Sequence, residues 1–488
     1  MIAGHPFDPH DETDKLREAC GVFGIYGHSD AGPHTALGLH ALQHRGQEAA
    51  GIVVYDGKHF NTHRDLGVVG DIFSSEQVMG RLTGHAAIGH VRYSTAGETA
   101  LRNVQPLFAD LQSGGFALAH NGNLTNALTL RRQLVERGSL FQSTSDTEVI
   151  VHLMATSESR NVVERMIDAL RKIEGAYSLV ALTESCVIGV RDPLGVRPLV
   201  LGRRGDVHIV TSETCALDII GAAFLRDVEA GEMVVLDESG VHSLRPFPPA
   251  SRRFCIFEYI YFARPDSVLE GASVYARRKR IGVELAKESG IEADVVIPVP
   301  DSGVPAAIGY AEAAGIPFEL GIIRNHYVGR TFIEPAEQIR HLGVKLKHSA
   351  NRATLEAKRV ILVDDSIVRG TTSVKIVEMV RAAGAAEVHM RIAAPPTAHS
   401  CFYGIDTPQR GELLASRMDV SAMASHIGVD SLAFVSMDGL YRAMGEPGRD
   451  NENPQFCDAC FTGDYPTQLT DHDSSDDPVQ LSLLAELA

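Results

Sequence analysis

One fifteen-residue segment, residues 359–373 (RVILVDDSIVRGTTS), constrains the fold of this chain more than any other. Its apolar run ends at Val363 and is followed by two carboxylates, a loop of small residues and a helical pattern. This order is typical of a buried strand in a parallel sheet, and ligands of such sheets bind where the strands end. The loop and the helix start offer hydroxyls and backbone N–H groups to a phosphate. The residues predicted to hold that phosphate are Arg369, Gly370, Thr371, Thr372 and Ser373.

The two carboxylates of this segment, Asp364 and Asp365, need partners other than a phosphate. Sugar hydroxyls and a hydrated Mg²⁺ suit their oxygen atoms. A second segment, residues 294–305 (DVVIPVPDSGVP), places another tight loop after an apolar run, and a third, residues 324–333 (RNHYVGRTFI), is basic within an acidic chain. Together the three segments resemble the type I phosphoribosyltransferases, which bind 5-phosphoribosyl-1-pyrophosphate (PRPP). The resemblance implies that the second segment holds pyrophosphate, with Ser302 joining the Mg²⁺ site, and that the third closes over the substrate.

The charge of the chain limits its partners. The 488 residues include 45 Lys and Arg against 62 Asp and Glu, so the formal net charge is −17. Such a surplus of acid disfavours the binding of nucleic acid or of an anionic membrane by the chain as a whole. No apolar run approaches the roughly 18 residues of a transmembrane helix, and residues 1–19 lack the apolar region of a secretory signal. We therefore expect a cytoplasmic protein with no membrane or nucleic-acid partner.

The pattern of apolar residues changes near residue 250, which predicts two large domains. Before this point, short strands such as residues 21–26 and 116–120 are separated by Gly-rich turns. The Pro-rich residues 244–253 (LRPFPPASRR) suit neither a central strand nor a helix. Beyond them strands alternate with helices, as in an α/β domain with a mostly parallel sheet. The expected division is residues 1–19, 20–250 and 251–465, followed by an acidic mobile tail, residues 466–488.

Cys20 stands in an unusual place for a core thiol, because Gly follows it directly and a strand-like run comes next. If residues 1–19 were removed, Cys20 would carry a free α-amino group. The reference pKa of that group is about 7.7–8.0, so it is able to act as a base near neutral pH. Residues 1–19 would then be a propeptide and Cys20 a self-contained nucleophile. A buried structural thiol is the more common role of a single Cys, so the motifs that accompany Cys20 decide between the two.

Several short motifs accompany Cys20 in a fixed order. They are CGVFGIYG at residues 20–27, LQHRGQEAAG at 42–51, HVRYSTAG at 90–97, HNGNL at 120–124, SDTE at 145–148 and RDPLGVRPL at 191–199. Together they resemble the N-terminal-nucleophile (Ntn) glutamine amidotransferases, whose fold is an αββα sandwich.

This resemblance assigns a role to each matching residue. Arg92 and Thr95 would bind the carboxylate of glutamine, and Asp146 would bind its ammonium group. Asn121 and the N–H of Gly122 would form the oxyanion hole for the tetrahedral intermediate at the nucleophile.

Both halves together, about residues 20–465, resemble one family, the amidophosphoribosyltransferases. The resemblance implies that glutamine, water and PRPP become 5-phosphoribosylamine, glutamate and pyrophosphate, the first committed step of de novo purine synthesis. Ammonia released at Cys20 would displace pyrophosphate from C1 of the ribose. Because water would protonate ammonia, we expect a closed path between the two sites. The family further implies feedback inhibition by purine nucleotides and a homo-oligomer, a tetramer or a dimer.

Four cysteines form a second candidate site. Cys457 and Cys460 make a C-x-x-C pair, and Cys255 and Cys401 lie far from them in the sequence. From the residues alone these could be ligands of Zn²⁺ or of an iron–sulfur cluster, or free buried thiols. One branch of the family carries a [4Fe–4S] cluster at matching positions, together with a cleaved leader before the nucleophile. The resemblance therefore implies a [4Fe–4S] cluster on these four thiols.

Three other classes of protein make different demands on the sequence. Another Ntn amidotransferase, such as a glucosamine-6-phosphate synthase or an asparagine synthetase, would need sugar-isomerase motifs or an SGGxDS loop, and neither occurs. A non-catalytic regulator of the phosphoribosyltransferase fold would bind PRPP and would not turn over glutamine. A structural or interaction protein would leave both sets of motifs unexplained.

Overall fold

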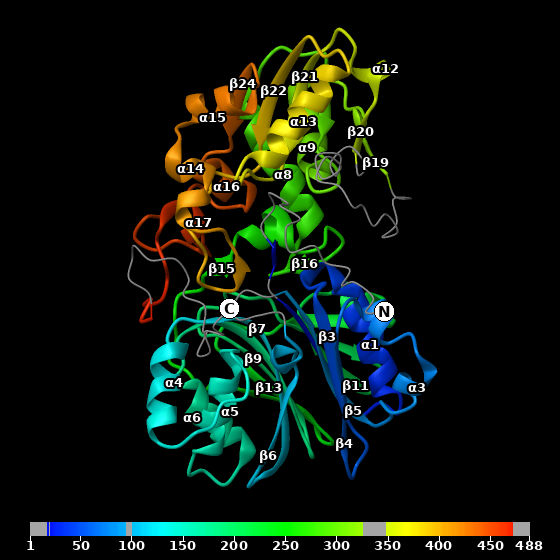
Figure 1. The fold of residues 1–488 in the computed structure, drawn as a ribbon, viewed down its shortest axis with the longest axis vertical. Helices are drawn as coiled ribbons and strands as arrows, with labels where there is room; N and C mark the ends of the chain where they lie inside the picture. Colours follow the sequence, from blue (N-terminus) through cyan, green and yellow to red (C-terminus); the bar gives the residue numbers. More distant parts are fainter. Residues whose placement is uncertain (1–16, 19, 94–99, 326–347, 472–488) are drawn as a thin grey trace, which may run out of the picture.

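The computed structural model describes residues 17–18, 20–93, 100–325 and 348–471. Two halves follow one another along its long axis, with the β-rich half below and the α/β half above (Figure 1). No helix within these ranges has both the length and the apolar character needed to cross a membrane.

Two antiparallel sheets form the first half. The seven strands of one lie in the order β12-β10-β11-β2-β5-β3-β4, and the six of the other in the order β14-β13-β9-β8-β7-β6. The first sheet consists of β2 (Gly21–Tyr26), β3 (Ala49–Tyr55), β4 (Phe60–Leu66), β5 (Ala86–Arg92), β10 (Val200–Arg204), β11 (Val207–Thr211) and β12 (Ala223–Asp227). The second consists of β6 (Leu107–Leu111), β7 (Gly114–Leu124), β8 (Gly175–Thr183), β9 (Val187–Arg191), β13 (Met233–Asp237) and β14 (Gly240–Leu244).

Helices cover the outer face of each sheet (Figure 1). Helix α1 (Ala31–Ala41), which packs on β2, β3 and β5, covers the first sheet, and α4 (Ala127–Glu136), α5 (Thr147–Ala155) and α6 (Val162–Leu170) cover the second. Apolar side chains of the two inner faces, such as Val53 and Val180, form a separate core between the sheets. The predicted αββα sandwich is therefore confirmed.

The second half is built on a parallel sheet in the order β18-β21-β22-β24. Its strands are β18 (Val295–Pro298), β21 (Arg359–Asp364), β22 (Glu387–Ile392) and β24 (Ser431–Phe434). The main helices are α8 (Val274–Ser289), α9 (Val304–Ala314), α13 (Thr371–Ala382), α15 (Val420–Ile427) and α16 (Met437–Ala443). Strands β18 and β21 are apolar almost throughout because both faces of the sheet are covered. The predicted α/β domain is confirmed.

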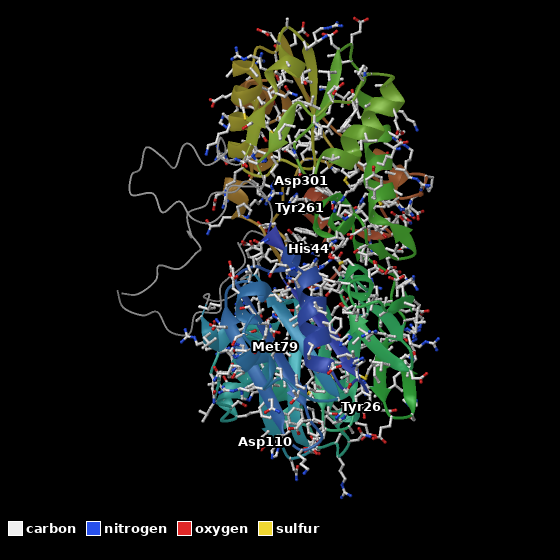
Figure 2. All side chains as sticks on the ribbon, turned by 90° about the vertical axis from the view of Figure 1, so that its right-hand side faces the viewer. Tyr26, His44, Met79, Asp110, Tyr261 and Asp301 are labelled. Carbon is white, nitrogen blue, oxygen red and sulfur yellow. The ribbon has the colours of Figure 1, made fainter. Side chains whose placement is uncertain are left out.

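Short elements join the halves. The Pro-rich segment leads from β14 to β15 (Phe254–Cys255), which pairs in parallel with β25 (Phe456–Cys457). A π-helix, η3 (Glu258–Phe262), follows directly and lies in the core that both halves share. Figure 2 shows His44 of the first half close to the level of Tyr261 and Asp301, whereas Tyr26 lies at the far end. The strand β2 therefore begins near the junction and ends away from it.

Two further pairs of strands lie near the junction and at the side of the second half. Strand β1 (Arg17–Glu18), part of the predicted propeptide, pairs with β23 (Ile405–Asp406). Strand β19 (Ile322–Arg324) pairs with β20 (His348–Ala350). The C-terminal elements include α17 (Ala459–Thr462), which directly follows Cys457.

Candidate functional site

Cys20 lies immediately before β2, at the end of the first sheet that faces the junction. Its side chain is buried, its N–H donates to the carbonyl of Arg45 (3.0 Å), and its Sγ lies 3.8 Å from the carbonyl oxygen of Tyr93. Burial raises the pKa of the Cys20 thiol to about 12, although the positive charge of Arg92 acts in the opposite direction. A thiol with this pKa needs a base beside it in order to attack at neutral pH.

Arg92 and Asp146 lie near Cys20 and come from two different elements, a strand and a helix start. Arg92 ends β5, the neighbour of β2, and donates to the carbonyl of Asn103 (2.5 Å). Asp146, just before α5, accepts from the N–H of Leu124 (3.0 Å). Burial acts to raise the pKa of the Asp146 carboxyl, but His120 and nearby N–H groups outweigh burial, and the net shift is downward. A buried cation and a buried anion therefore stand near the thiol, as a zwitterionic ligand requires.

The candidate oxyanion hole lies at the end of β7. The side chain of Asn121 is fully buried, and neither its Nδ2 nor its Oδ1 has a hydrogen-bond partner among the described residues. Gly122 has a φ of +145°, and a Cβ there would lie 2.0 Å from the carbonyl oxygen of Ala176, so only glycine fits. A buried amide without a partner is costly in a folded protein. Asn121 is therefore poised for a polar group that the chain itself does not supply.

The carboxylates predicted for the phosphoribosyl site lie at the carboxyl end of β21. Asp364 and Asp365 are 3% and 2% exposed. Asp365 accepts hydrogen bonds from the hydroxyls of Ser302 and Ser366, and the N–H of Asp365 donates to Asp364 (2.9 Å). The second predicted segment therefore does meet the first, because β18 and β21 are neighbours in register.

The small-residue loop leads directly into α13. Gly370 has a φ of +83° at the N-cap position, a conformation that favours glycine. The Thr371 hydroxyl is buried without a hydrogen-bond partner among the residues that the structure describes, and Ser373 is also buried. Arg369 is partly exposed and pairs with Glu412 (2.9 Å). The geometry offers backbone and hydroxyl donors to a phosphate at the start of this helix.

Some predicted residues lie outside the described ranges. Thr95 is one, and so is most of the predicted closing loop, including Tyr327, Gly329 and Arg330. Arg324, at the start of that loop, is described and forms an ion pair with Asp301 of the pyrophosphate segment.

The four cysteines of the second candidate site come together at the junction. Cys255 and Cys457 are register partners in the pair β15–β25, and Cys460 follows in α17. Burial raises the pKa of Cys457 and of Cys460 well above the usual value, and the charges of Cys255 and Cys401 raise it further. Among the described residues, no three Cys, His, Asp or Glu side chains are grouped closely enough to hold a single metal ion. Each of the seven cysteines, all within the described ranges, is a free thiol.

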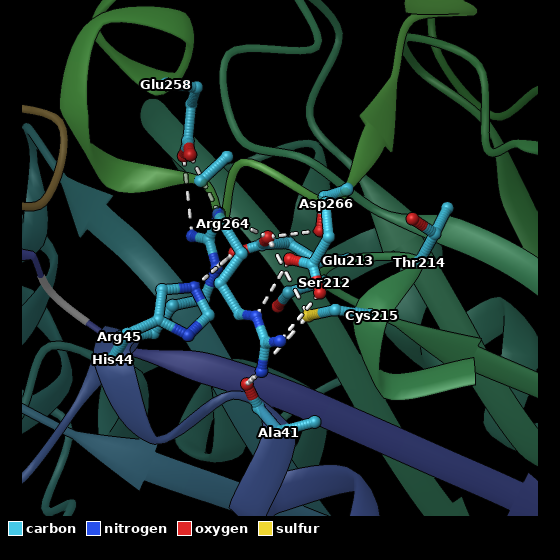
Figure 3. Close-up of polar contacts among 12 residues, drawn as sticks. Ala41, His44, Arg45, Ser212, Glu213, Thr214, Cys215, Glu258, Arg264 and Asp266 are labelled. Atoms are coloured by element: carbon cyan, nitrogen blue, oxygen red, sulfur yellow. Dashed lines mark hydrogen bonds and ion pairs between the residues drawn. The ribbon is translucent and has the colours of Figure 1, made fainter. Parts of the chain in front are cut away.

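A buried network of charges around Arg45, whose carbonyl accepts from the N–H of Cys20, joins the two halves (Figure 3). The guanidinium of Arg45 pairs with Glu213 and with Glu258 of the π-helix (2.7 Å to Glu258). Glu258 also pairs with Arg197 (3.3 Å), and all four side chains are almost fully buried. Burial acts to raise the pKa of Glu213, but Arg45 and His44 outweigh it and lower that pKa well below its usual range. The carbonyl of Arg45 accepts from the N–H of Cys20, and its side chain pairs with Glu258 of the second half. Arg45 thus links the segment around Cys20 to the second half.

Comparison with known proteins finds a matching domain family for each half. A model of the glutamine amidotransferase domain matches residues 90–218, and a model of the phosphoribosyl transferase domain matches residues 266–399. The chain is 58% identical over 493 residues to the amidophosphoribosyltransferase of Rhizobium etli. The match covers 99% of this chain and 99% of that one. The chain belongs to the amidophosphoribosyltransferase family.

Further relatives agree with this family. The chain is 50% identical over 459 residues to the amidophosphoribosyltransferase of Bacillus subtilis, covering 94% of this chain and 96% of that one. A solved structure, glutamine PRPP amidotransferase from B. subtilis complexed with ADP and GMP, matches with a TM-score of 0.87 and 50% identity. The match covers 92% of this chain and 98% of the solved chain.

Family membership establishes the reaction. As an amidophosphoribosyltransferase, the chain releases ammonia from glutamine and transfers it to C1 of PRPP, giving 5-phosphoribosylamine, glutamate and pyrophosphate. The reaction belongs to de novo purine synthesis. The lower half is therefore the glutaminase half, and the upper half is the phosphoribosyl half.

Sequence reasoning about this amidophosphoribosyltransferase missed the residues that connect its halves. Arg45 and Arg197 fall within motifs that were singled out, and Glu258 lies three residues after Cys255, but no spacing indicated that they pair. Arg278 was also missed: from α8, it donates to the carbonyls of residues 259, 261 and 263 around the end of the π-helix. The available signal was an Arg placed at helical spacing among the apolar Val274, Ile281 and Leu285.

Proposed function

We propose that Cys20 is the glutaminase nucleophile and that removal of residues 1–19 frees its α-amine to act as the base. The backbone of Cys20 supports this proposal, because its φ is +84°, a conformation that costs a non-glycine residue roughly 1–3 kcal/mol. An N-terminal residue has no such torsion, so removal of the leader would relieve the strain. The α-amine would lie within reach of the carbonyl of Arg45, which accepts from the same nitrogen now.

The charges around the thiol support roles for further residues of the glutaminase half. We propose that Arg92 binds the carboxylate of glutamine, with Thr95, and that Asp146 binds its ammonium group. The buried amide of Asn121 and the N–H of Gly122 would stabilise the oxyanion as the amide is attacked. The single observation that carries this assignment is the Asn121 side chain, which is fully buried with neither polar atom partnered in the described structure.

In the phosphoribosyl half, residues 369–373 would bind the 5′-phosphate of PRPP, and Asp364 and Asp365 would bind the ribose hydroxyls and Mg²⁺. The donor set suits Mg²⁺, which proteins hold through one or two carboxylates together with substrate phosphates. The hydroxyl of Ser302, already bonded to Asp365, would lie at the edge of that site. When bound, Mg²⁺ would offset negative charge on the leaving pyrophosphate. The protein residues position the ribose C1 for attack.

Ammonia must travel between the sites without meeting bulk water. The π-helix lies between them in the shared core, and its Tyr259, Ile260 and Phe262 are buried. We propose that ammonia passes along these buried aromatic and aliphatic side chains of the junction. Neutral ammonia is favoured in such surroundings because burial penalises the charged ammonium ion.

We propose further that Cys255, Cys401, Cys457 and Cys460 hold a [4Fe–4S] cluster. Three of these thiols are buried, and Cys401 is partly buried. Their charges oppose one another's ionisation, which suits a cationic group that would stabilise the thiolates. The cysteine sulfurs that bind a four-iron cluster lie farther apart than those that bind a single metal ion. A cluster therefore does not require the close grouping of side chains that a single ion needs. Anaerobic iron and sulfide analysis tests this: Cys457→Ser should lose the cluster, whereas Cys186→Ser, another buried thiol, should keep it. Retention in Cys457→Ser would refute the ligand set.

We also make proposals about the regulation, assembly and location of the protein. The solved relative from B. subtilis is complexed with ADP and GMP, which supports feedback inhibition of this chain by purine nucleotides. We also propose a homo-oligomer, a tetramer or a dimer. Seven free thiols support a reducing compartment such as the cytoplasm.

The assignment of the oxyanion hole is tested by Asn121→Ala. We expect the kcat for glutamine to fall by roughly 10²–10³, as for loss of one oxyanion donor in other enzymes, while ammonia-dependent synthesis is retained. Full glutamine-dependent activity in this variant would contradict the assignment.

A further inference from the structure

A segment from the far end of the chain closes the turn that follows the candidate oxyanion hole. The carboxylate of Asp471 accepts hydrogen bonds from the N–H groups of Leu128 (2.6 Å) and Thr129 (3.0 Å) and from the Thr129 hydroxyl (2.6 Å). The N–H of Asp471 donates to the carbonyl of Thr125 (2.9 Å). These bonds fasten the end of β7, which carries Asn121, to the first turn of α4. The start of the segment expected to be a mobile tail is therefore bonded to the glutaminase half.

Helix α4 does not supply this cap from its own sequence. Asn126 is its N-cap residue, but the side chain makes no capping bond. It instead donates to the carbonyl of Lys172 (2.9 Å) and accepts from the N–H of Glu174 (3.0 Å). A carboxylate at a helix N-terminus satisfies free N–H groups and interacts favourably with the helix dipole. Asp471 thus caps the N-terminus of α4, although it lies more than 340 residues away in the sequence. A residue directly before the helix usually has this role.

Gly122 and Asn123, at the end of β7, also contact the C-terminal part of the chain. Gly404, with a φ of +100°, packs so closely on Gly122 that a Cβ would lie 2.8 Å from the carbonyl carbon of Gly122. The side chain of Asn123 donates to the carbonyl of Phe402 (3.0 Å). The end of β7 and the turn that follows it therefore contact two C-terminal segments.

These two segments are bonded to each other. The hydroxyl of Tyr465 donates to the carbonyl of Ser400 (2.6 Å), and the hydroxyl of Tyr403 accepts from the N–H of Thr467 (3.1 Å). We call residues 465–471 the C-terminal strap. The strap runs from the junction, past the loop that contains Tyr403, to the first turn of α4.

We propose that the C-terminal strap, through Asp471, positions the oxyanion hole of the glutaminase half. The proposal rests on the assignment of Asn121 and Gly122 as that hole. Donors in an oxyanion hole act only when they are fixed in place before the charge develops. Asp471 touches no substrate in this account, so it is a positioning residue. Its loss should therefore lower kcat for glutamine more than it changes KM.

Two substitutions of Asp471 test the proposal in the full-length enzyme. Asp471→Ala removes all of the carboxylate bonds, and Asp471→Asn keeps one acceptor oxygen. We expect kcat for glutamine hydrolysis to fall by roughly tenfold or more in Asp471→Ala and by less in Asp471→Asn, since a positioning group contributes less than the donor itself. The KM for glutamine and the ammonia-dependent activity should stay within about twofold in both. Asp464→Asn, an exposed acid close by that pairs with Arg449, is the matched control and should match wild type.

A second readout separates positioning from general stability. The γ-aldehyde of glutamate forms a tetrahedral adduct with a thiol, so its inhibition constant reports on the oxyanion hole itself. That constant should rise in Asp471→Ala by about the same factor as kcat falls. Parallel loss of glutamine-dependent and ammonia-dependent activity, or unchanged activity in Asp471→Ala, would overturn the proposal.

Asn121→Ala, assayed in the same series, separates a failure of the proposed strap role from a failure of the oxyanion-hole assignment. If Asn121→Ala loses glutamine turnover and Asp471→Ala does not, only the role of the strap is refuted. If Asn121→Ala keeps full turnover, the oxyanion assignment fails and the role of the strap fails with it.

Discussion

The two halves build their candidate sites in different ways. In the glutaminase half, Cys20, Arg92, Asn121 and Asp146 are buried side chains that come from two sheets and the segments between them. In the phosphoribosyl half, the site lies at the open end of parallel strands and consists of two carboxylates and a loop of small residues.

This difference follows from the chemistry of each half. Covalent attack on an amide needs a nucleophile, a base and oxyanion donors fixed at short range. Displacement of pyrophosphate by ammonia needs mostly positioning and compensation of charge, which backbone donors and carboxylates supply. The glutaminase half should therefore be sensitive to single buried side chains and to the contacts that hold them, whereas the phosphoribosyl half should be sensitive to its carboxylates.

The largest expected effect separates the halves completely. Cys20→Ala should lower glutamine-dependent synthesis by roughly 10³-fold or more, because no other group would replace the proposed nucleophile. Ammonia-dependent synthesis should be retained. Both rates are measured as formation of pyrophosphate, and Cys186→Ala, a buried thiol of the same half, is the control. Equal loss of both activities in Cys20→Ala would mean that the halves do not work separately.

The junction should be the most costly place to remove a charge. Glu258→Gln leaves Arg45 and Arg197 without their shared carboxylate, and loss of one partner of a buried pair destabilises by about 3–5 kcal/mol. The thermal midpoint should fall accordingly. Glu229→Gln, which removes a half-exposed pair with Arg245, should cost no more than about 1 kcal/mol. Similar midpoints for the two variants would show that the network does not hold the halves together.

A carboxylate of the phosphoribosyl half should affect both nitrogen sources alike. Asp365→Asn should lower glutamine-dependent and ammonia-dependent synthesis together by roughly 10- to 100-fold through weaker binding of Mg²⁺ and PRPP. Hydrolysis of glutamine without PRPP should persist. Asp419→Asn, which exchanges one good helix cap for another, serves as the control. Loss of glutamine-dependent synthesis alone would place Asp365 in the wrong site.

The smallest expected effect is the change in stability over one pH unit in mild acid. Burial lowers the pKa of His90 to about 3, so the unfolded chain takes up a proton near pH 6.5 that the folded chain does not. The contribution of neutral His90 to the free energy of unfolding is therefore fully present above pH 6.5. It is lost as the pH falls toward 3, by up to about 1.4 kcal/mol per pH unit. The thermal midpoint of the wild type should fall more steeply between pH 6 and 5 than that of His90→Gln. His59→Gln, at an exposed position, should keep the wild-type slope; equal slopes for all three would refute the effect.

The sequence predicted the phosphoribosyl half better than the connections within the glutaminase half. Residues 359–373 are contiguous, so strand, carboxylates, loop and helix could be read in order, and the sheet confirmed them. The contact of Asp471 with Leu128 and the pairing of Arg45 with Glu258 join residues that are far apart in the sequence. Such contacts depend on tertiary packing, which neither periodicity nor local spacing encodes.

The most direct test of the central claim is the intact mass of the anaerobically purified, active enzyme, together with its N-terminal sequence. We expect a chain that begins at Cys20, with the α-amine free beside the buried thiol. A chain that still begins at Met1 and is active with glutamine would show that the α-amine is not the base, and it would contradict the proposed glutaminase mechanism.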